Sequence, residues 1–248
     1  MPVTGVWQIL GDSVWPIVRA SLAMTIPISL AAFAIGLAIG VIVAIARLSK
    51  WRALRLLVWF YVWVFRGSPL LVQLYIVFFG LPTVGINLHP VTAAIATLAL
   101  NIGAFCSETI RACITAVPAG QWEAAKAVGL TGAQTMQLIV LPQAVTAAIP
   151  PLGNSFISLV KDTSLVSSIT VVELFRVSQQ IAARTYEILP LYLLAAAVYL
   201  FYSTLLTWLQ QKLETHFGGA SKASSAQLAG RTAKPLKRQD RTAAILAA

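Results

Sequence analysis

Hydrophobic residues in this chain of 248 residues are gathered into long runs that contain no charged residue. A membrane-spanning helix needs about 20 mostly apolar residues, and each run is long enough for at least one such helix. The strands of a membrane barrel would instead alternate between apolar and polar positions over about 10 residues, and these runs do not alternate. The pattern therefore predicts an all-α integral membrane protein. The charge-free runs are Ala20–Ala46, Gly67–Ser107, Ala127–Val160 and Ile188–Gln211.

Polar residues between the runs predict about five transmembrane helices. In the first helix, Gly36 and Gly40 have the spacing that lets two helices approach closely. The second helix should break after Arg66, because Gly67-Ser68-Pro69 disfavours a continuing helix. Such a break frees backbone groups for contact with a ligand. The crossings are predicted at residues 22–46, 54–79, 91–114, 140–181 and 188–211.

The fourth crossing has the least regular pattern. Pro142, Pro150 and Pro151 are expected to break its helix, because proline lacks the backbone N–H and its ring clashes with the preceding turn. Lys161 and Asp162 then interrupt the apolar pattern. The limits of this crossing therefore stay open between residues 140 and 181.

The two ends of the chain differ from the membrane-spanning part, residues 20–211. In residues 1–19 apolar residues recur at helical spacing and include Trp7 and Trp15. This predicts a short amphipathic helix on the membrane surface. Residues 212–248 are rich in Ala, Ser, Gly, Lys and Arg, which predicts a disordered cytoplasmic tail.

The positions of the charged residues predict the orientation in the membrane. Charged residues make up only 10% of the chain, against about a quarter in a soluble domain. Of the 18 Lys and Arg residues, 11 lie in residues 47–55 and 212–241. Basic residues accumulate on cytoplasmic loops, so the N-terminus should lie outside and the C-terminus in the cytoplasm, after an odd number of crossings. The net charge of +10 therefore reflects topology and gives no support to nucleic-acid binding.

Residues 118–142 carry the most specific local pattern. Glu123 to Val128 favour a helix, Gly129 suits the left-handed position that ends one, and Thr131 can cap a second helix. This predicts two short helices joined by a glycine turn on the cytoplasmic side. The small residues on the first helix suit docking into a groove of another protein. An ordinary interhelical loop is the alternative, and spacing alone leaves both open.

This stretch, with the pattern E-A-A-x3-G-x9-I-x-L-P from Glu123 to Pro142, resembles the EAA loop of bacterial ABC importer permeases. Other segments resemble the polar-amino-acid branch of that family and follow the same order. The resemblance covers about residues 20–211. Ser68 stands where Thr is more usual, and Cys106 where an aromatic residue is frequent. The segments are FRGSPLLVQL (65–74), SETIRA (107–112), VPAGQWEAA (117–125), LPQA (141–144), IPPLGNSFI (149–157), LVKDTSL (159–165) and VEL (172–174).

The resemblance implies a type I ABC importer permease of the bacterial cytoplasmic (inner) membrane, surrounded by membrane lipid. It implies a second permease copy, identical or different, and ABC ATPase subunits that bind ATP and Mg²⁺. It also implies an extracytoplasmic binding protein that delivers a polar amino acid. The chain has no Gly-Lys dipeptide, hence no Walker A loop of its own. The residues expected to couple transport to the ATPase are Glu123, Ala124, Ala125, Gly129 and Pro142.

Charged groups at membrane depth are costly, which makes them candidates for the substrate path. Glu108 and Arg111 have the i, i+3 spacing of an ion pair. A zwitterionic amino acid needs an anionic and a cationic partner, and the candidates supply both. A purely structural Glu108–Arg111 pair, and a role for Arg66 in the dimer interface, are the alternatives. The candidates are Arg66, Glu108, Arg111, Asn154, Lys161, Asp162, Thr163 and Ser164.

Other classes of membrane protein fit the sequence less well. An ion-gradient-driven secondary transporter of a small polar solute usually has two matching halves, and five crossings do not divide in that way. An enzyme would need a nucleophile with its base, and no such set is visible. Cys106 and Cys113 are too far apart on one predicted helix for a disulfide, and no set of metal ligands accompanies these buried thiols. We therefore expect a transport subunit without a metal or cofactor of its own.

Overall fold

The computed structural model describes residues 3–232, with side chains for residues 5–215, and contains no strand among them. The chain divides into two units, Met1–Gln210 and Gln211–Ala248, and the arrangement given below is that of the first. The elements are α1 (Val3–Ala20), η1 (Ser21–Thr25), α2 (Ile26–Arg47), α3 (Arg52–Gly67), α4 (Leu70–Tyr75), η2 (Ile76–Gly80), η3 (Leu81–Val84), α5 (Pro90–Thr115), α6 (Ala119–Ala127), α7 (Gly132–Thr135), η4 (Met136–Val140), α8 (Leu141–Asp162), η5 (Thr163–Ile169), α9 (Leu174–Thr185) and α10 (Ile188–Thr232).

The described residues contain four helical stretches that are long and apolar enough to cross a membrane. A fifth crossing results if α3 and the following stretch Leu70–Val84 count as one, although the two are bent by 108° relative to each other. The predicted all-helical fold with about five crossings is confirmed, and so is the break after Arg66. The four stretches are Gly5–Arg47, Pro90–Thr115, Gly132–Ile169 and Ile188–Thr215.

Proline does not break the crossings in the way the sequence suggests. In the described part of the chain, three π-helical turns each end two residues before a proline. A π turn widens the helix, which makes room for the proline ring and for the carbonyl that has lost its N–H partner. The breaks expected at Pro142, Pro150 and Pro151 are therefore wrong, since α8 continues through them to Asp162. The turns and prolines are η1 with Pro27, η2 with Pro82 and η4 with Pro142.

At both ends of the described chain, helix extends beyond the predicted membrane crossings. α1 is helical, as predicted, and continues through η1 into α2. Its position on the membrane surface stays a prediction. α10 continues to Thr232, beyond residue 212, where the predicted tail begins. Residues 233–248 of that tail lie outside the described residues.

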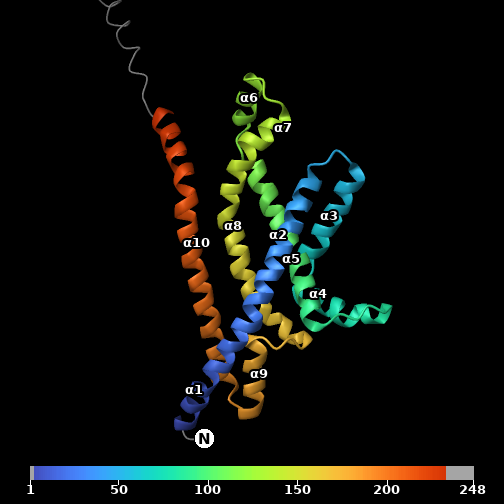
Figure 1. The fold of residues 1–248 in the computed structure, drawn as a ribbon, viewed down its shortest axis with the longest axis vertical. Helices are drawn as coiled ribbons and strands as arrows, with labels where there is room; N and C mark the ends of the chain where they lie inside the picture. Colours follow the sequence, from blue (N-terminus) through green and yellow to red (C-terminus); the bar gives the residue numbers. More distant parts are fainter. Residues whose placement is uncertain (1–2, 233–248) are drawn as a thin grey trace, which may run out of the picture. The chain divides into compact units, whose positions relative to one another are not determined.

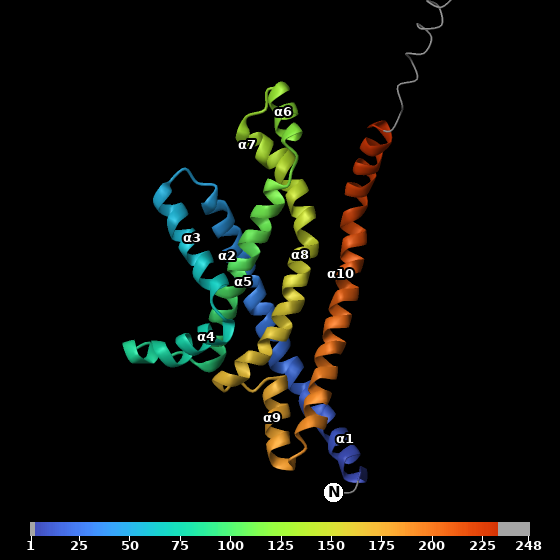
Figure 2. The same cartoon turned by 180° about the vertical axis from the view of Figure 1, so that it is seen from behind.

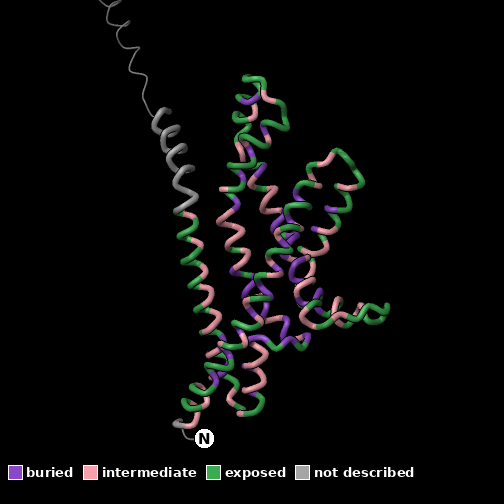
Figure 3. Tube along the Cα trace, in the orientation of Figure 1, coloured by how far each residue is buried: buried purple, intermediate pink, exposed green. Residues whose placement is uncertain are grey.

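The core of the first unit forms where α2 and α5 run side by side (Figures 1 and 2). A Cβ on Gly40 would lie 2.7 Å from the Cβ of Cys106, and one on Gly103 would lie 3.0 Å from the carbonyl oxygen of Gly36. Only glycine permits so close an approach of two helix backbones. The predicted close contact at Gly36 and Gly40 is confirmed, and buried residues concentrate along this α2–α5 seam (Figure 3).

The connections of this unit lie at two opposite ends. The α2–α3 connection and the helices α6 and α7 lie at one end, whereas α9 and the start of α1 lie at the other (Figure 1). The α2–α3 connection carries Lys50 and Arg52, and basic residues of this kind favour the cytoplasmic side. The loop formed by α6 and α7 lies at the same end, and its cytoplasmic placement stays a prediction.

A buried carboxylate joins the helices at the non-cytoplasmic end. Glu173 has no exposed surface, and its carboxylate accepts two backbone N–H groups at the start of α9, at 2.9 and 2.7 Å. Tyr199 of α10 donates its hydroxyl to the same carboxylate at 2.9 Å. The backbone N–H of Leu174 donates to the hydroxyl of Thr25 in η1 at 3.3 Å. The cap of α9 is thereby tied to α10 and to the turn between α1 and α2.

Replacing Gly36 by Ala is expected to destabilise the α2–α5 seam. The added methyl group would lie 2.8 Å from the carbonyl oxygen of Ala99 and against Ile102, and overpacking of this kind typically costs about 1–3 kcal/mol. Thermal unfolding of the purified protein in detergent measures the loss. Gly120→Ala is the matched control, because nothing lies within 4 Å of a Cβ at that helical position. Equal stability of the two variants would contradict the seam.

The stability contributed by Glu173 is expected to depend on pH. Burial raises the pKa of its carboxyl above the ordinary value of 4.5, although the hydrogen bonds it accepts act in the opposite direction. Between the two values the folded protein keeps a proton that the unfolded chain has lost. Stability is therefore greatest at low pH and declines as the pH rises through this window. Glu173→Gln should abolish the decline, and unfolding free energies that vary with pH in parallel for both proteins would refute this.

Candidate functional site

Glu108 lies at the centre of a cluster of charged side chains, the Glu108 cluster, which comprises Arg47, Arg66, Glu108 and Arg111. Arg111 follows Glu108 by one turn on α5 and donates from Nη2 to Glu108 Oε2 at 3.0 Å. Arg47, at the end of α2, forms an ion pair with Glu108 Oε1. Arg66, at the end of α3, has its Nη1 3.9 Å from Glu108 Oε2. One carboxylate therefore joins three helices and faces three guanidinium groups.

The directions of the helices explain why these side chains meet at one depth. Side chains on a helix lean towards its N-terminus. Arg47 therefore reaches back from the cytoplasmic end of α2, and Arg66 reaches towards that end from the far end of α3. Glu108 lies on α5 about 10 Å from the cytoplasmic end of that helix, at about 1.5 Å per residue. The cluster is consequently located between the helices, nearer to the end of the unit that carries the α2–α3 connection.

A hollow of about 400 Å³ opens beside the Glu108 cluster. Its wall is aromatic: the rings of Trp59 and Trp63 stack with their centroids 6.0 Å apart. The guanidinium of Arg66 lies 5.3 Å from the centre of the Phe105 ring. Because three cations surround one anion, the hollow has an excess of positive charge. Such a site can hold a carboxylate while an apolar group packs against the rings.

Two amide side chains bind backbone carbonyls at the break after α3. The amide nitrogen of Gln73 donates to the carbonyl oxygen of Phe65 at 2.9 Å and to that of Ser68 at 3.1 Å. Asn101 of α5 donates to the same Phe65 carbonyl at 3.2 Å and to the amide oxygen of Gln73 at 2.9 Å. The carbonyls of Phe65 and Ser68 are thus satisfied inside the protein. Contact of the remaining freed backbone groups with a ligand stays a prediction.

The other substrate-path candidates form a separate group near the C-terminal end of α8. Lys161 lies about 30 Å from the cytoplasmic start of α8 and is exposed, whereas Asp162 is half-buried. Asn154 accepts a hydrogen bond from Gln210 of α10 at 3.2 Å. Among the described residues, no hydrogen bond or ion pair joins this group to Glu108. The structure therefore brings together Arg66, Glu108 and Arg111, and leaves apart Asn154, Lys161, Asp162, Thr163 and Ser164.

The loop between α5 and α8 has the geometry that its sequence predicts. Gly129 has a φ of 82°, and the N–H groups of Gly129 and Leu130 donate to carbonyls in the last turn of α6, both at 3.0 Å. This is the Schellman ending of a helix. At the start of α7, Thr131 Oγ1 accepts from the N–H of Gln134 at 3.3 Å, and the Gln134 side chain accepts from the N–H of Thr131 at 2.9 Å. This reciprocal pair is a capping box.

The residues predicted to couple transport to the ATPase do not all lie on the surface. Ala125 is only 1% exposed, so it packs inside the loop and offers no surface to another protein. Its predicted part in coupling to the ATPase stays a prediction. Val128, next to the glycine turn, is 76% exposed and adds an apolar side chain to the accessible face. The exposed predicted residues are Glu123, Ala124, Gly129 and Pro142.

Sequence reasoning missed three residues of the site: Arg47, Gln73 and Asn101. The basic run 47–55 is explained by topology, and this hides the pairing of Arg47 with Glu108. Gln73 and Asn101 are amides inside a long charge-free run, and polar groups at membrane depth are candidates by default, so they could have been found. Cys106 is buried and Cys113 half-buried, and both are free thiols, as predicted.

A bundle of apolar helices with an exposed helical loop at one end and a charged cluster between its helices is typical of a membrane transport subunit. Residues 36–218 match the family described as "Binding-protein-dependent transport system inner membrane component". The chain belongs to this family.

Individual relatives agree with the family assignment. The chain is 45% identical to TcyB, an L-cystine transport system permease of Bacillus subtilis. The alignment spans 209 residues and covers 84% of this chain and 89% of the relative. It is 38% identical over 223 residues to the arginine permease ArgU of Corynebacterium glutamicum, covering 83% and 70%. A crystal structure of an amino acid ABC transporter with histidines superposes with a TM-score of 0.78 at 35% identity, covering 81% of this chain and 94% of that one.

The family resemblance stated from the motifs is therefore confirmed. The chain is a permease subunit of the amino-acid ABC importers, with the type I permease fold. The MetNI methionine transporter supports the fold alone, with a TM-score of 0.62 at 23% identity, covering 88% of this chain and 99% of that one. An ion-gradient-driven transporter is not favoured. Permeases of this family have no ATPase site of their own.

Replacing Glu108 by Gln is expected to destabilise the protein by about 3 kcal/mol. Removal of one partner from a buried ion pair typically costs about 3–5 kcal/mol, and the lower end applies here because the Arg47 and Glu108 side chains are 20% and 19% exposed. The double variant Glu108→Gln/Arg47→Gln should recover part of the loss, because it also removes one of the stranded charges. Thermal unfolding of the three proteins measures both effects. If the double variant is less stable than Glu108→Gln alone, the pairing of Arg47 with Glu108 is disproved.

Proposed function

We propose that this chain imports a polar amino acid across the bacterial inner membrane by alternating access. Separate ABC ATPase subunits bind ATP and Mg²⁺ and hydrolyse the ATP, a second permease copy completes the pore, and an extracytoplasmic binding protein delivers the substrate. Membership of the binding-protein-dependent family supports these partners. The observation that carries the proposal is the exposed loop of α6 and α7 on the cytoplasmic side.

The α6–α7 loop has the properties of a docking element. Its first helix presents Glu123 and Ala124 to solvent, and small side chains allow close contact with a groove of the ATPase. The Schellman turn at Gly129 and the capping box at Thr131 fix the ends of the two helices, and Trp122 of α6 packs against Ile114 of α5 and Ala144 of α8. Pro142 directs the chain into α8, which connects the loop to the substrate path. Closure of the ATPases can therefore move α8 through a rigid loop.

The substrate path includes two groups of side chains at different depths. Lys161 and Asp162 lie near the non-cytoplasmic end of α8, together with Asn154, Thr163 and Ser164. The Glu108 cluster lies nearer the cytoplasm. Each group offers a cation and an anion, which is what the ammonium and carboxylate of an amino acid require. An importer that alternates between outward-open and inward-open states can use the first group on entry and the second before release.

Relatives of this chain are named for several substrates, including cystine, arginine and glutamine. These molecules differ in side-chain charge and share only the amino acid head. The common chemistry supports a polar amino acid as the substrate class. ATPase stimulation of the reconstituted complex by each of these amino acids, delivered on the binding protein, identifies which one this transporter carries.

Replacing Gly129 by Leu is expected to abolish ATP-driven uptake while the protein still inserts into the membrane. A side chain at a φ of 82° is strained by about 1–2 kcal/mol, and it also widens the docking face. Gly132→Leu is the matched control, because Gly132 is equally exposed and has nothing within 4 Å of a Cβ but has no positive φ. Uptake of radiolabelled amino acid into proteoliposomes that contain the full complex is the measurement. Equal uptake by the two variants would reject docking through this turn.

A further inference from the structure

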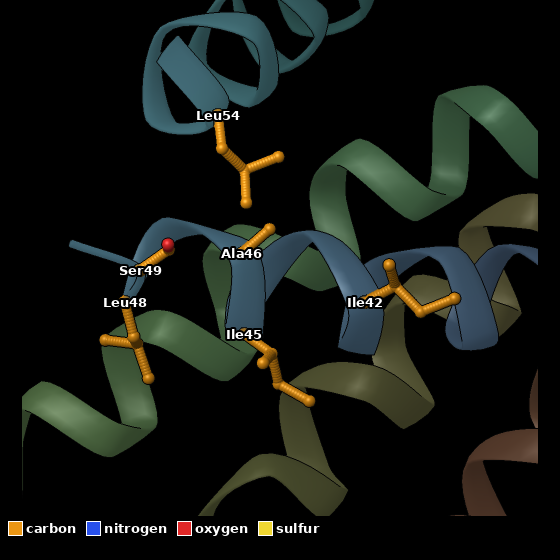
Figure 4. Close-up of a pocket in the computed structure, with 6 residues that line it drawn as sticks. All are labelled: Ile42, Ile45, Ala46, Leu48, Ser49 and Leu54. Carbon is orange, nitrogen blue, oxygen red and sulfur yellow. The ribbon is translucent and has the colours of Figure 1, made fainter. Parts of the chain in front are cut away.

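A second hollow of about 630 Å³ lies between the cytoplasmic ends of α2 and α3, and it is separate from the Glu108 cluster. This α2–α3 hollow is lined by Ile42, Ile45, Ala46, Leu48, Ser49 and Leu54. Ala46 and Leu54 point towards one another across the gap between the two helices (Figure 4). Five of its six lining residues are apolar, and the hollow is a shallow depression that is open to the surroundings of the helices.

The α2–α3 hollow extends from the membrane interior to its surface. Its inner part is formed by Ile42 and Ala46, which belong to the charge-free run of the first crossing. Its outer part is the connection to α3, where Trp51 is 77% exposed. Exposed tryptophan is typical of the headgroup level of a membrane. An occupant of the hollow therefore meets hydrocarbon at one end and headgroups at the other.

The rim of the α2–α3 hollow carries three basic side chains that form no ion pair with a described acidic residue. Lys50, Arg52 and Arg55 are exposed, and none forms an ion pair with another described residue. The sequence contains no acidic residue between Asp12 and Glu108. Glu108 already faces three other arginines. Among the described ion pairs none involves these three bases, so their charge is available to an anionic ligand.

We propose that the α2–α3 hollow binds an anionic phospholipid of the cytoplasmic leaflet. One acyl chain packs against the apolar lining, and the headgroup phosphate pairs with Lys50, Arg52 and Arg55. Basic pockets between membrane helices on the cytoplasmic side are known to bind anionic headgroups. A phospholipid is favoured over a protein, because the occupant must be hydrocarbon at the depth of Ile42 and anionic at the rim. This site is independent of substrate import and of the docking loop.

Retention of lipid by the full-length protein tests the proposal. The protein is incorporated into mixed vesicles of phosphatidylcholine and phosphatidylglycerol and extracted in mild detergent, and the lipids that remain bound are counted by native mass spectrometry. We expect enrichment of phosphatidylglycerol over its proportion in the vesicles. The variant Lys50→Gln/Arg52→Gln/Arg55→Gln should lower its affinity about fivefold for each base removed, which corresponds to about 1 kcal/mol per base.

Two further variants separate a built site from general charge attraction. Ala46→Phe fills the hollow and keeps all three bases, and it should lower retention to the vesicle proportion. Lys234→Gln/Lys237→Gln/Arg238→Gln removes the same number of charges from the C-terminal segment, and it should leave retention unchanged. Retention that falls in both triple variants but persists in Ala46→Phe would overturn the proposal in favour of non-specific attraction. Displacement of the lipid by inorganic phosphate alone would overturn it in favour of a simple anion site.

Retention of phosphatidylglycerol also distinguishes the lipid from a protein occupant. If a second copy of the chain or an ATPase subunit covers the hollow, the assembled complex retains no phosphatidylglycerol in excess of the vesicle proportion, and cysteines placed at Ala46 crosslink to the partner in that complex. That result would overturn the proposal. Because the lipid count needs neither substrate nor ATP, it stands whether or not amino acid uptake is observed.

Discussion

The close contact between α2 and α5 is the constraint on which the rest of the first unit depends. In a membrane, apolar helices gain little from being buried against each other, so association relies on tight packing and on polar bonds. Gly36, Gly40 and Gly103 remove the side chains that would hold the two backbones apart. The resulting seam places the end of α2 beside Glu108 of α5. The position of the charged cluster therefore depends on glycine at these three positions.

The Glu108 cluster combines a structural and a functional possibility in one set of residues. A single carboxylate that bonds to α2, α3 and α5 holds the inner half of the bundle together. Its excess of positive charge also makes it suitable for a substrate carboxylate. A substrate that enters the cluster competes for the same ion pairs that join the helices. Binding and helix movement can thereby be coupled at one point, which alternating access requires.

The parts of the fold that depend on neighbouring residues could be predicted well from the sequence. The glycine turn at Gly129 and the cap at Thr131 are such cases, because their hydrogen bonds close within a few residues. The expectation that prolines break the fourth crossing was wrong, because it depends on more than neighbouring residues. Whether Pro142 breaks a helix or is accommodated by a π turn depends on how the helix packs, and no local rule decides it. The bonds of Gln73 and Asn101 at the broken helix join residues far apart in the chain and were missed.

The sequence by itself determined that the protein is helical and embedded in a membrane, and which family it belongs to, and it predicted an orientation. These features follow from runs of apolar residues, from the placement of basic residues and from contiguous motifs, all of which are local. The tertiary structure decided which charged residues meet. It joined Arg47 to Glu108, separated Lys161 and Asp162 from them, buried Ala125 and closed the broken helix with two amides. The physical reason is that an ion pair or a buried contact needs two groups at one place, and only the packing of distant helices sets that distance.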